Sequence, residues 1–301
     1  MVISKRFTAI TIPVLLIILL FALFIDLPLS QHFMNQNSIF GTVFQDFGLF
    51  PPTLILIISM IILNFYVFTH FKNRVAQYII LLMTFLYTLI KTNLFVSETF
   101  KYIFSTIDNI QKHKPMGVAS NEGDASNTLS LGTSYVITFI LLIIIAFSVY
   151  QFWLKQVTAL ELERLFKVAF VSFLVLLIGL ELIDSLKEMW GRARPYEIGH
   201  HGAYFTNWLT VNGNTGHSSF PSGHTTDAAF LMFMAFYFNT RVAQKRMFLI
   251  GFMFTIIMCA SRLRIGAHFL GDVTMAFTLI LLLIIAADYI IYKWHDKNQI
   301  T

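Results

Sequence analysis

Long uninterrupted apolar runs dominate the pattern of hydrophobic and polar positions along this chain. Each run approaches the roughly 20 residues that a helix needs to cross the hydrocarbon core of a bilayer. The runs are continuous rather than alternating, which predicts helices instead of the strands of a barrel. Eight such runs are found, at Phe7–Ile25, Leu54–Phe71, Ala76–Phe95, Tyr135–Leu154, Val168–Ile183, His224–Asn239, Met247–Arg264 and Val273–Tyr292.

Composition supports the same interpretation. The chain of 301 residues is 56% hydrophobic and only 12% charged, and its mean hydropathy is +0.70. These values are far too apolar for an ordinary water-soluble globule. We therefore predict an all-α fold, a polytopic membrane helical bundle of about eight transmembrane helices. The single cysteine, Cys259, rules out a disulfide within the chain.

The distribution of basic residues predicts an orientation in the membrane. Lys5 and Arg6 precede the first run, which is too long for a signal peptide and has no small-residue cleavage site after it. The loop 26–50 carries no lysine or arginine, as the positive-inside rule expects of an outer loop. We expect both termini to be cytoplasmic in a plasma membrane. The net charge of +5 then reflects topology, and no nucleic-acid partner is needed to explain it.

Several cations nevertheless fall at the predicted outer ends of the later spans. They are Lys187, Arg192, Arg194, Arg262 and Arg264. Cations on the wrong side of a membrane protein usually pair with acids, and Glu181, Asp184 and Glu188 are nearby in the sequence. The alternative is an anionic ligand.

The first of three motifs at these ends is LKEMWGRARP, which places Lys187 and Arg194 seven residues apart. On a helix this spacing is about two turns, or roughly 10 Å, although Gly191 and Pro195 indicate that the helix ends here. Two cations on one face can bind an anion. Taken alone, the pair is also typical of an interfacial anchor.

The second motif is PSGH, in which Ser222 can cap a helix that begins near Gly223 and His224. The first N–H groups of a helix have no partners within it, and together with the helix dipole they favour an anion such as phosphate. The alternative is a capped helix whose histidine simply lies at headgroup level.

The third motif is SRLRIGAHFLGD, which contains Arg262, His268 and Asp272. If this stretch is helical, His268 and Asp272 share a face, and the carboxylate can hold one ring nitrogen while the other reacts. A zinc site formed with His224 is the alternative. The neighbouring arginines and lysine would repel a metal cation.

Read in order, Lys-x6-Arg-Pro, Pro-Ser-Gly-His and Ser-Arg-x5-His-x3-Asp resemble the three-part signature of the type 2 phosphatidic acid phosphatase superfamily. The superfamily is related to vanadium haloperoxidases, and the composition matches its membrane lipid phosphate phosphatase branch. The resemblance implies that His268 forms a phosphohistidine, that Asp272 orients it and that His224 protonates the leaving oxygen. It implies no metal and no cofactor. The residues that it implies as ligands of the phosphoryl oxygens are Lys187, Arg194, Ser222, Gly223 and Arg262.

The resemblance also predicts how the chain is divided. The family's core usually has six helices, so the core would begin near Ala76. We expect residues 76–301 to form the phosphatase core, with the active site in 187–272. Residues 1–75 would then form an additional N-terminal transmembrane helical pair, for which the resemblance implies no role.

The predicted function is hydrolysis of a membrane lipid phosphate at the outer face. Undecaprenyl pyrophosphate is the first expectation, followed closely by diacylglycerol pyrophosphate, phosphatidate and phosphatidylglycerophosphate. One alternative is a phosphotransferase, in which a lipid or sugar hydroxyl intercepts the phosphohistidine. Another, from a different class, is a transporter of anionic lipids that performs no chemistry. The pair His268 and Asp272, together with His224, favours an enzyme, because a transporter does not need it.

Overall fold

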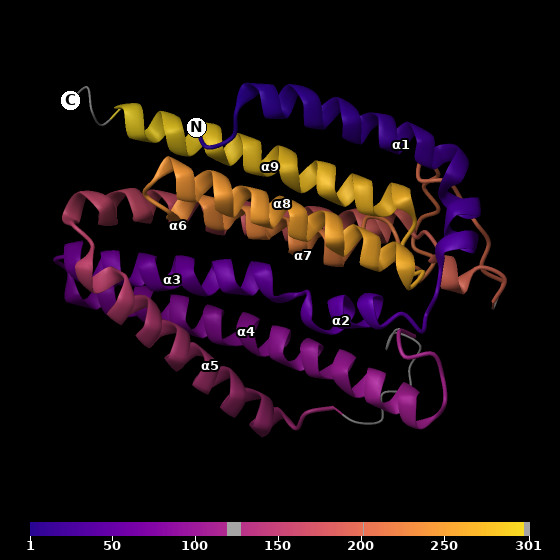
Figure 1. The fold of residues 1–301 in the computed structure, drawn as a ribbon. Coiled ribbons are helices and arrows are strands. Elements are labelled where there is room, and N and C mark those ends of the chain that lie inside the picture. Colours follow the sequence, from indigo (N-terminus) through magenta and orange to yellow (C-terminus); the bar gives the residue numbers. More distant parts are fainter. Residues whose placement is uncertain (119–127, 201, 298–301) are drawn as a thin grey trace.

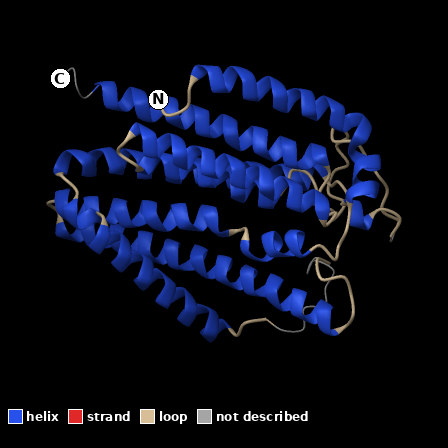
Figure 2. Ribbon diagram, viewed as in Figure 1, coloured by secondary structure: helices blue, strands red, loops and turns tan. Residues whose placement is uncertain are grey.

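The computed structural model describes residues 1–118, 128–200 and 202–297, and within these ranges it contains helices and loops but no strand (Figure 2). Seven helical segments of this part are long and apolar enough to cross a membrane. The predicted polytopic helical bundle is therefore confirmed. The α-helices are α1 (Lys5–Phe33), α2 (Ile39–Phe47), α3 (Phe50–His70), α4 (Arg74–Gln111), α5 (Leu131–Phe152), α6 (Ala159–Trp190), α7 (Gly223–Phe230), α8 (Arg241–Arg264) and α9 (Leu270–Lys297).

Side-chain caps begin most of these helices, because a hydroxyl or amide oxygen satisfies one of the N–H groups that the first turn leaves free. The capping residues are Ser4, Ser38, Asn73, Ser130, Thr158, Ser222 and Thr240. Between α2 and α3 the cause of the break is different. Pro51 and Pro52 cannot donate hydrogen bonds back into α2, so a new helix starts at Phe50.

The chain passes back and forth along the bundle, and the first residues of the chain lie toward the same end as the last turns of α9 (Figure 1). The opposite end carries the loops 191–222 and 265–269, and with them the three motifs. We call it the site end.

The sixth predicted span forms the centre of the bundle. It consists of α7 followed by a 3₁₀ segment, Leu231–Tyr237, and for this reason it is not among the seven long helices. Phe230 and Phe233 are completely buried in it. Helix α8 packs closely against this segment, since a β-carbon at Gly251 would lie 2.5 Å from the backbone nitrogen of Met232.

The segment that follows the third predicted span is in part helical. Helix α4 continues to Gln111, whereas hydropathy predicted that the helix would end near Phe95. Tyr102, Ser105 and Asn109 are buried at helical spacing along this extension, and α4 packs against α2. This buried stripe indicates that contacts with the rest of the protein stabilise the extension. Residues 119–127, between α4 and α5, lie outside the described residues.

Helix α1 runs along α9 and is fastened near both of its ends (Figure 1). Near the termini, the carboxylate of Asp288 accepts hydrogen bonds from the backbone N–H groups of Val2 and Ile3 at 2.9 and 2.8 Å. At the site end, Arg264 donates to the carbonyl of Phe33 at 2.7 Å. The first helix is therefore an integral part of the bundle.

Candidate active site

A cavity of about 400 Å³ opens at the site end of the bundle. Five of the residues predicted from the motifs line it: Lys187, Arg194, Gly223, His224 and His268. The other three, Ser222, Arg262 and Asp272, are almost completely buried. The fold thus brings all three motifs together. Glu98, Asp184 and Asp227 line the same cavity.

The end of α6 positions the two cations of the first motif. Gly191 ends this helix in the left-handed conformation, with φ of +48°, and its N–H donates to the carbonyl of Lys187. A β-carbon at Gly191 would lie 1.9 Å from the carbonyl oxygen of Gly213, so the turn requires glycine. Lys187 consequently lies in the last helical turn and pairs with Asp184 at 3.3 Å, as the sequence suggested.

Arg194 follows this turn and is held by the loop that covers the site. Its Nη1 donates to the hydroxyl of Tyr196 at 2.8 Å, and its Nη2 donates to Ser218 Oγ at 3.3 Å. The backbone N–H of Arg194 also donates to Glu197 Oε2 at 2.6 Å, so the loop holds both the main chain and the side chain of this residue.

The second motif begins α7 directly beside Lys187. Ser222 caps the helix by accepting a hydrogen bond from the N–H of Thr225 at 3.4 Å. A β-carbon at Gly223 would lie 2.9 Å from Lys187 Nζ. The absence of a side chain on Gly223 therefore leaves room for the ammonium group at the helix N-terminus, where an anion is favoured.

His268 lies in the loop before α9 rather than on the helix itself. Its Nδ1 is 2.7 Å from the backbone carbonyl of Ser219 and 3.7 Å from Asp272 Oδ2. A carbonyl oxygen only accepts hydrogen bonds, so Nδ1 carries the proton and Nε2 of the neutral ring keeps its lone pair. Ser219, which the motifs did not indicate, thus sets the tautomer that a nucleophilic histidine requires.

Burial also lowers the pKa of His268 from its ordinary value of 6.5 to about 4. Desolvation of the imidazolium outweighs the stabilisation that the Asp272 carboxylate provides, and the positive charge of Arg194 acts in the same direction as burial. His268 is therefore neutral, and able to act as a nucleophile, throughout the neutral pH range.

Asp272 lies in the first turn of α9 and organises the backbone around His268. Its Oδ2 accepts hydrogen bonds from Ser219 Oγ at 2.6 Å and from the N–H of Phe269 at 2.9 Å. Its Oδ1 accepts from Arg192. The carboxylate thereby fixes Ser219 and Phe269, which lie next to the imidazole of His268. Its Oδ2 is 3.7 Å from Nδ1 of the ring.

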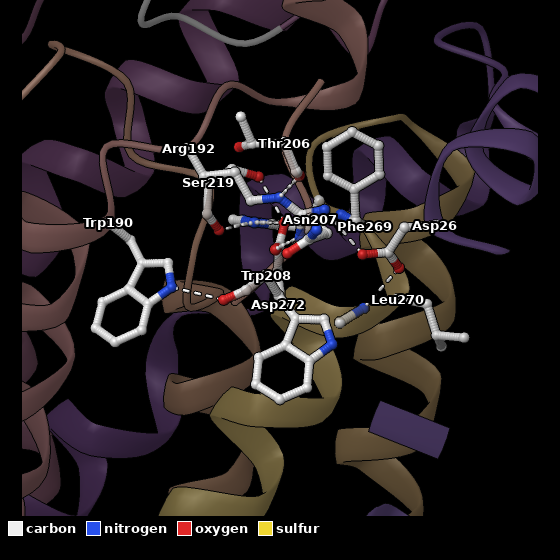
Figure 3. Close-up of polar contacts among 12 residues, drawn as sticks. Asp26, Trp190, Arg192, Thr206, Asn207, Trp208, Ser219, Phe269, Leu270 and Asp272 are labelled. Carbon is white, nitrogen blue, oxygen red and sulfur yellow. Dashed lines mark hydrogen bonds and ion pairs between the residues drawn. The ribbon is translucent and has the colours of Figure 1, made fainter. Parts of the chain in front are cut away.

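Arg192 is the buried centre of this network (Figure 3). Besides Asp272, it donates to Asp26 Oδ2 at 2.8 Å and to the carbonyl of Thr206 at 2.8 Å. The guanidinium lies 4.3 Å from the centroid of the Phe269 ring. The sequence marked Arg192 as a misplaced cation but suggested acids close to it in the chain. Its true partners, Asp26 and Asp272, are distant in sequence, and only the fold brings them together.

Arg262 is buried close to His224, and residues of α2 contact both. Nη2 of Arg262 donates to Gln45 Oε1 at 3.0 Å, while its Nε and Nη1 are buried without a hydrogen-bond partner among the described residues. Nε2 of His224 lies 3.2 Å from the backbone carbonyl of Gln45. Sequence reasoning did not identify Gln45, because it lies outside the three motifs.

The cavity is lined by cations as well as by the three acids Glu98, Asp184 and Asp227. Lys187 and Arg194 line it, and the unpaired nitrogens of Arg262 are the kind of donors that phosphoryl oxygens satisfy. Within the described ranges, no group of three or more histidine, cysteine, aspartate or glutamate residues is arranged to hold a metal ion.

Comparison with known families gives one match. The family model described as the PAP2 superfamily matches residues 138–299, which is more than half of the chain. The match includes all three motifs and excludes α1, α2, α3 and α4. No curated protein and no solved structure matches the chain.

The buried charges around Arg192 generate a prediction about stability. Asp26→Ala should lower the free energy of unfolding by about 3–5 kcal/mol, because it removes one partner of a fully buried ion pair. The matched control is Asp108→Ala, whose partner Lys112 is 46% exposed and whose loss should cost less than about 1 kcal/mol. Unfolding in detergent micelles measures both. Similar losses for the two variants would contradict a structural role of Asp26.

The environment of His268 predicts its protonation state. In protein labelled with ¹⁵N-histidine, the resonances of His268, assigned with His268→Gln, should report the tautomer protonated at Nδ1 from pH 8 down to pH 5. Because the folded-state pKa lies near 4, the charged form should appear only as the pH falls toward that value. A titration midpoint near 6.5 or protonation at Nε2 would contradict the geometry.

Proposed function

The chain belongs to the PAP2 superfamily, and from this membership and its membrane-spanning helices we propose that it is an integral membrane lipid phosphatase. Its substrate would be an isoprenoid or glycerolipid phosphate or pyrophosphate, with undecaprenyl pyrophosphate as the first candidate. Catalysis would take place at the outer face of a bacterial-type plasma membrane, with both termini in the cytoplasm.

The observation that carries this proposal is the pairing of a neutral nucleophile with a set of cations around one cavity. His268 has a free Nε2 lone pair because the carbonyl of Ser219 holds its Nδ1 proton. Lys187 and Arg194 line the same cavity, and buried Arg262 keeps two nitrogens without a partner among the described residues. Such a site combines nucleophilic attack with stabilisation of a negatively charged phosphoryl group.

The mechanism follows from these positions. Nε2 of His268 attacks phosphorus while the bond from phosphorus to the leaving oxygen breaks, and His224 donates a proton to that oxygen. The phosphohistidine is then attacked by water, which gives its proton to His224, so that phosphate and the starting enzyme are formed. Lys187, Arg194, Arg262, Ser222 and the backbone of Gly223 would bind the phosphoryl oxygens. Both steps transfer a phosphoryl group and a proton, and neither is an oxidation or a reduction.

A groove beside the cavity supports a lipid substrate. It has a volume of about 310 Å³ and is lined by residues of α3, α4 and α6, among them Leu56, Leu94 and Leu177. Five residues line both the groove and the cavity: Leu49, Glu98, Leu180, Asp184 and Asp227. A phosphate bound near His268 would therefore have a path for its hydrocarbon chain past the leucines of the groove, since Leu94 and Leu177 are also exposed at the surface of the bundle.

The direct test is phosphate release by purified protein in detergent with a chelator present. The substrates are a polyprenyl pyrophosphate, phosphatidate, phosphatidylglycerophosphate and a soluble sugar phosphate. Turnover should survive chelation and vanish in His268→Ala.

The variant His224→Ala should lower the rate about 10²–10⁴-fold on substrates with poor leaving groups and much less on p-nitrophenyl phosphate. Transfer of phosphate to a lipid or sugar hydroxyl would indicate a phosphotransferase, and no reaction at all would favour transport.

The groove generates a separate prediction about chain recognition. Leu94→Trp should lower kcat/KM for a long-chain lipid phosphate roughly tenfold, since each displaced methylene contact is worth about 0.8 kcal/mol, and should leave p-nitrophenyl phosphate unaffected. Leu82→Trp is the control, because Leu82 lies on the same helix with similar exposure, 58% against 56%, but outside the groove. Equal effects of the two variants would place the lipid chain elsewhere.

A further inference from the structure

Gln45 on α2 contacts two of the predicted site residues at once. Its side-chain Oε1 accepts a hydrogen bond from Arg262 Nη2 at 3.0 Å, and its backbone carbonyl accepts one from Nε2 of His224 at 3.2 Å. Gln45 is 2% exposed. It lies outside residues 138–299, in the N-terminal pair for which the sequence indicated no role. One residue of this pair therefore joins the second motif to the third.

The way in which α2 packs explains how Gln45 reaches these partners. A β-carbon at Gly41 would lie 2.0 Å from Ile265 Cγ2, and one at Gly48 would lie 2.1 Å from Met258 Cε. Gly41, Gln45 and Gly48 follow one another at helical spacing, so they share the face of α2 that packs against α8. The two glycines permit the close approach, and Gln45 occupies the position between them.

The chemistry of a glutamine suits this position. A neutral amide oxygen orients the Arg262 guanidinium without cancelling its charge, so Nε and Nη1 keep their attraction for anionic oxygens. A carboxylate in its place would compete with the substrate phosphate. The adjacent carboxylate, Asp46, accepts a hydrogen bond from Thr106 at 3.2 Å and attracts Arg262 electrostatically without a hydrogen bond to it among the described residues.

The backbone carbonyl of Gln45 fixes the protonation of His224 at Nε2. Because a carbonyl only accepts, Nε2 of His224 carries a proton whether the ring is neutral or charged, and Nδ1 is the nitrogen that gains or loses one. The edge of the Tyr102 ring, 5.4 Å between centroids, packs against the imidazole. The contact with α2 thus assigns the transferable proton of His224 to Nδ1.

We propose that Gln45 is a positioning residue of the phosphoryl-binding site, orienting Arg262 toward the phosphoryl oxygens and holding the ring of His224. The inference rests on the proposed function, since it takes Arg262 as a ligand of the phosphoryl group. It gives the additional N-terminal helical pair a role in substrate binding.

The test compares Gln45→Glu and Gln45→Met with wild type in full-length protein. Binding of orthophosphate is measured by thermal stabilisation, and KM and kcat are measured separately. Gln45→Glu should weaken orthophosphate binding by about tenfold or more, because its carboxylate takes the charge-assisted contact of Arg262. KM should rise more than kcat falls. Gln45→Met, which removes the acceptor without adding charge, should show a smaller loss in the same direction.

Gln111→Glu is the matched control, since it adds the same charge at the exposed last residue of α4, at the site end. It should bind orthophosphate like wild type. Folded Gln45 variants with wild-type KM and orthophosphate affinity would overturn the proposal, and if Gln45→Glu does not fold, Gln45→Met decides.

The two proposals fail in distinguishable ways. A wild-type protein that binds orthophosphate but hydrolyses no lipid phosphate overturns the proposed function, while the binding comparison still tests Gln45. A wild type that neither binds orthophosphate nor releases it overturns both.

Discussion

A guanidinium removed from water must be surrounded by acceptors, and Arg192 finds them on three separate segments. Asp26 comes from the first helix, Asp272 from the start of the last helix and the carbonyl of Thr206 from the loop over the site. Both carboxylates are completely buried with it. Removing either acid would leave the buried charge of Arg192 poorly compensated. Burial of Arg192 in the bundle therefore requires that both Asp26 and Asp272 stay paired with it.

The geometry of the proposed catalytic site extends from this ion network. The carboxylate that neutralises Arg192 also binds Ser219 Oγ and the N–H of Phe269, and these two residues flank the imidazole of His268 in space. A second oxygen of Asp26 accepts from the N–H of Gly271 at 2.9 Å, in the first turn of α9. Packing between α1 and α9 is thereby coupled to the placement of the proposed nucleophile.

The same arrangement gives the N-terminal segment a part in the proposed site. Asp26 of α1 stabilises the centre of the network, Gln45 of α2 contacts Arg262 and His224, and Leu56 of α3 lines the groove beside the cavity. Each of these residues lies outside the part of the chain that the PAP2 family model matches. In this protein the family's motifs are completed by partners from another part of the chain.

Local patterns were sufficient to predict much of the molecule. Apolar runs located the membrane helices, because crossing a bilayer demands length and hydropathy that any single segment must carry by itself. Hydropathy did not predict the extension of α4 to Gln111. In this extension, a stripe of polar and aromatic side chains on the helix is buried against the protein instead of facing lipid. Hydropathy also missed α2, which is too short to register as a span and is stabilised by close packing at Gly41.

The sequence by itself determined the class of fold, the family and the eight motif residues, since each motif is a short stretch whose chemistry is local. Only the tertiary structure decided what surrounds them: the carbonyl of Ser219 that sets the tautomer of His268, the acids that neutralise Arg192 and the contact of Gln45 with Arg262. Hydrogen bonds and buried ion pairs depend on distances of about 3 Å between atoms far apart in the chain. No pattern of spacing along a single sequence encodes those distances.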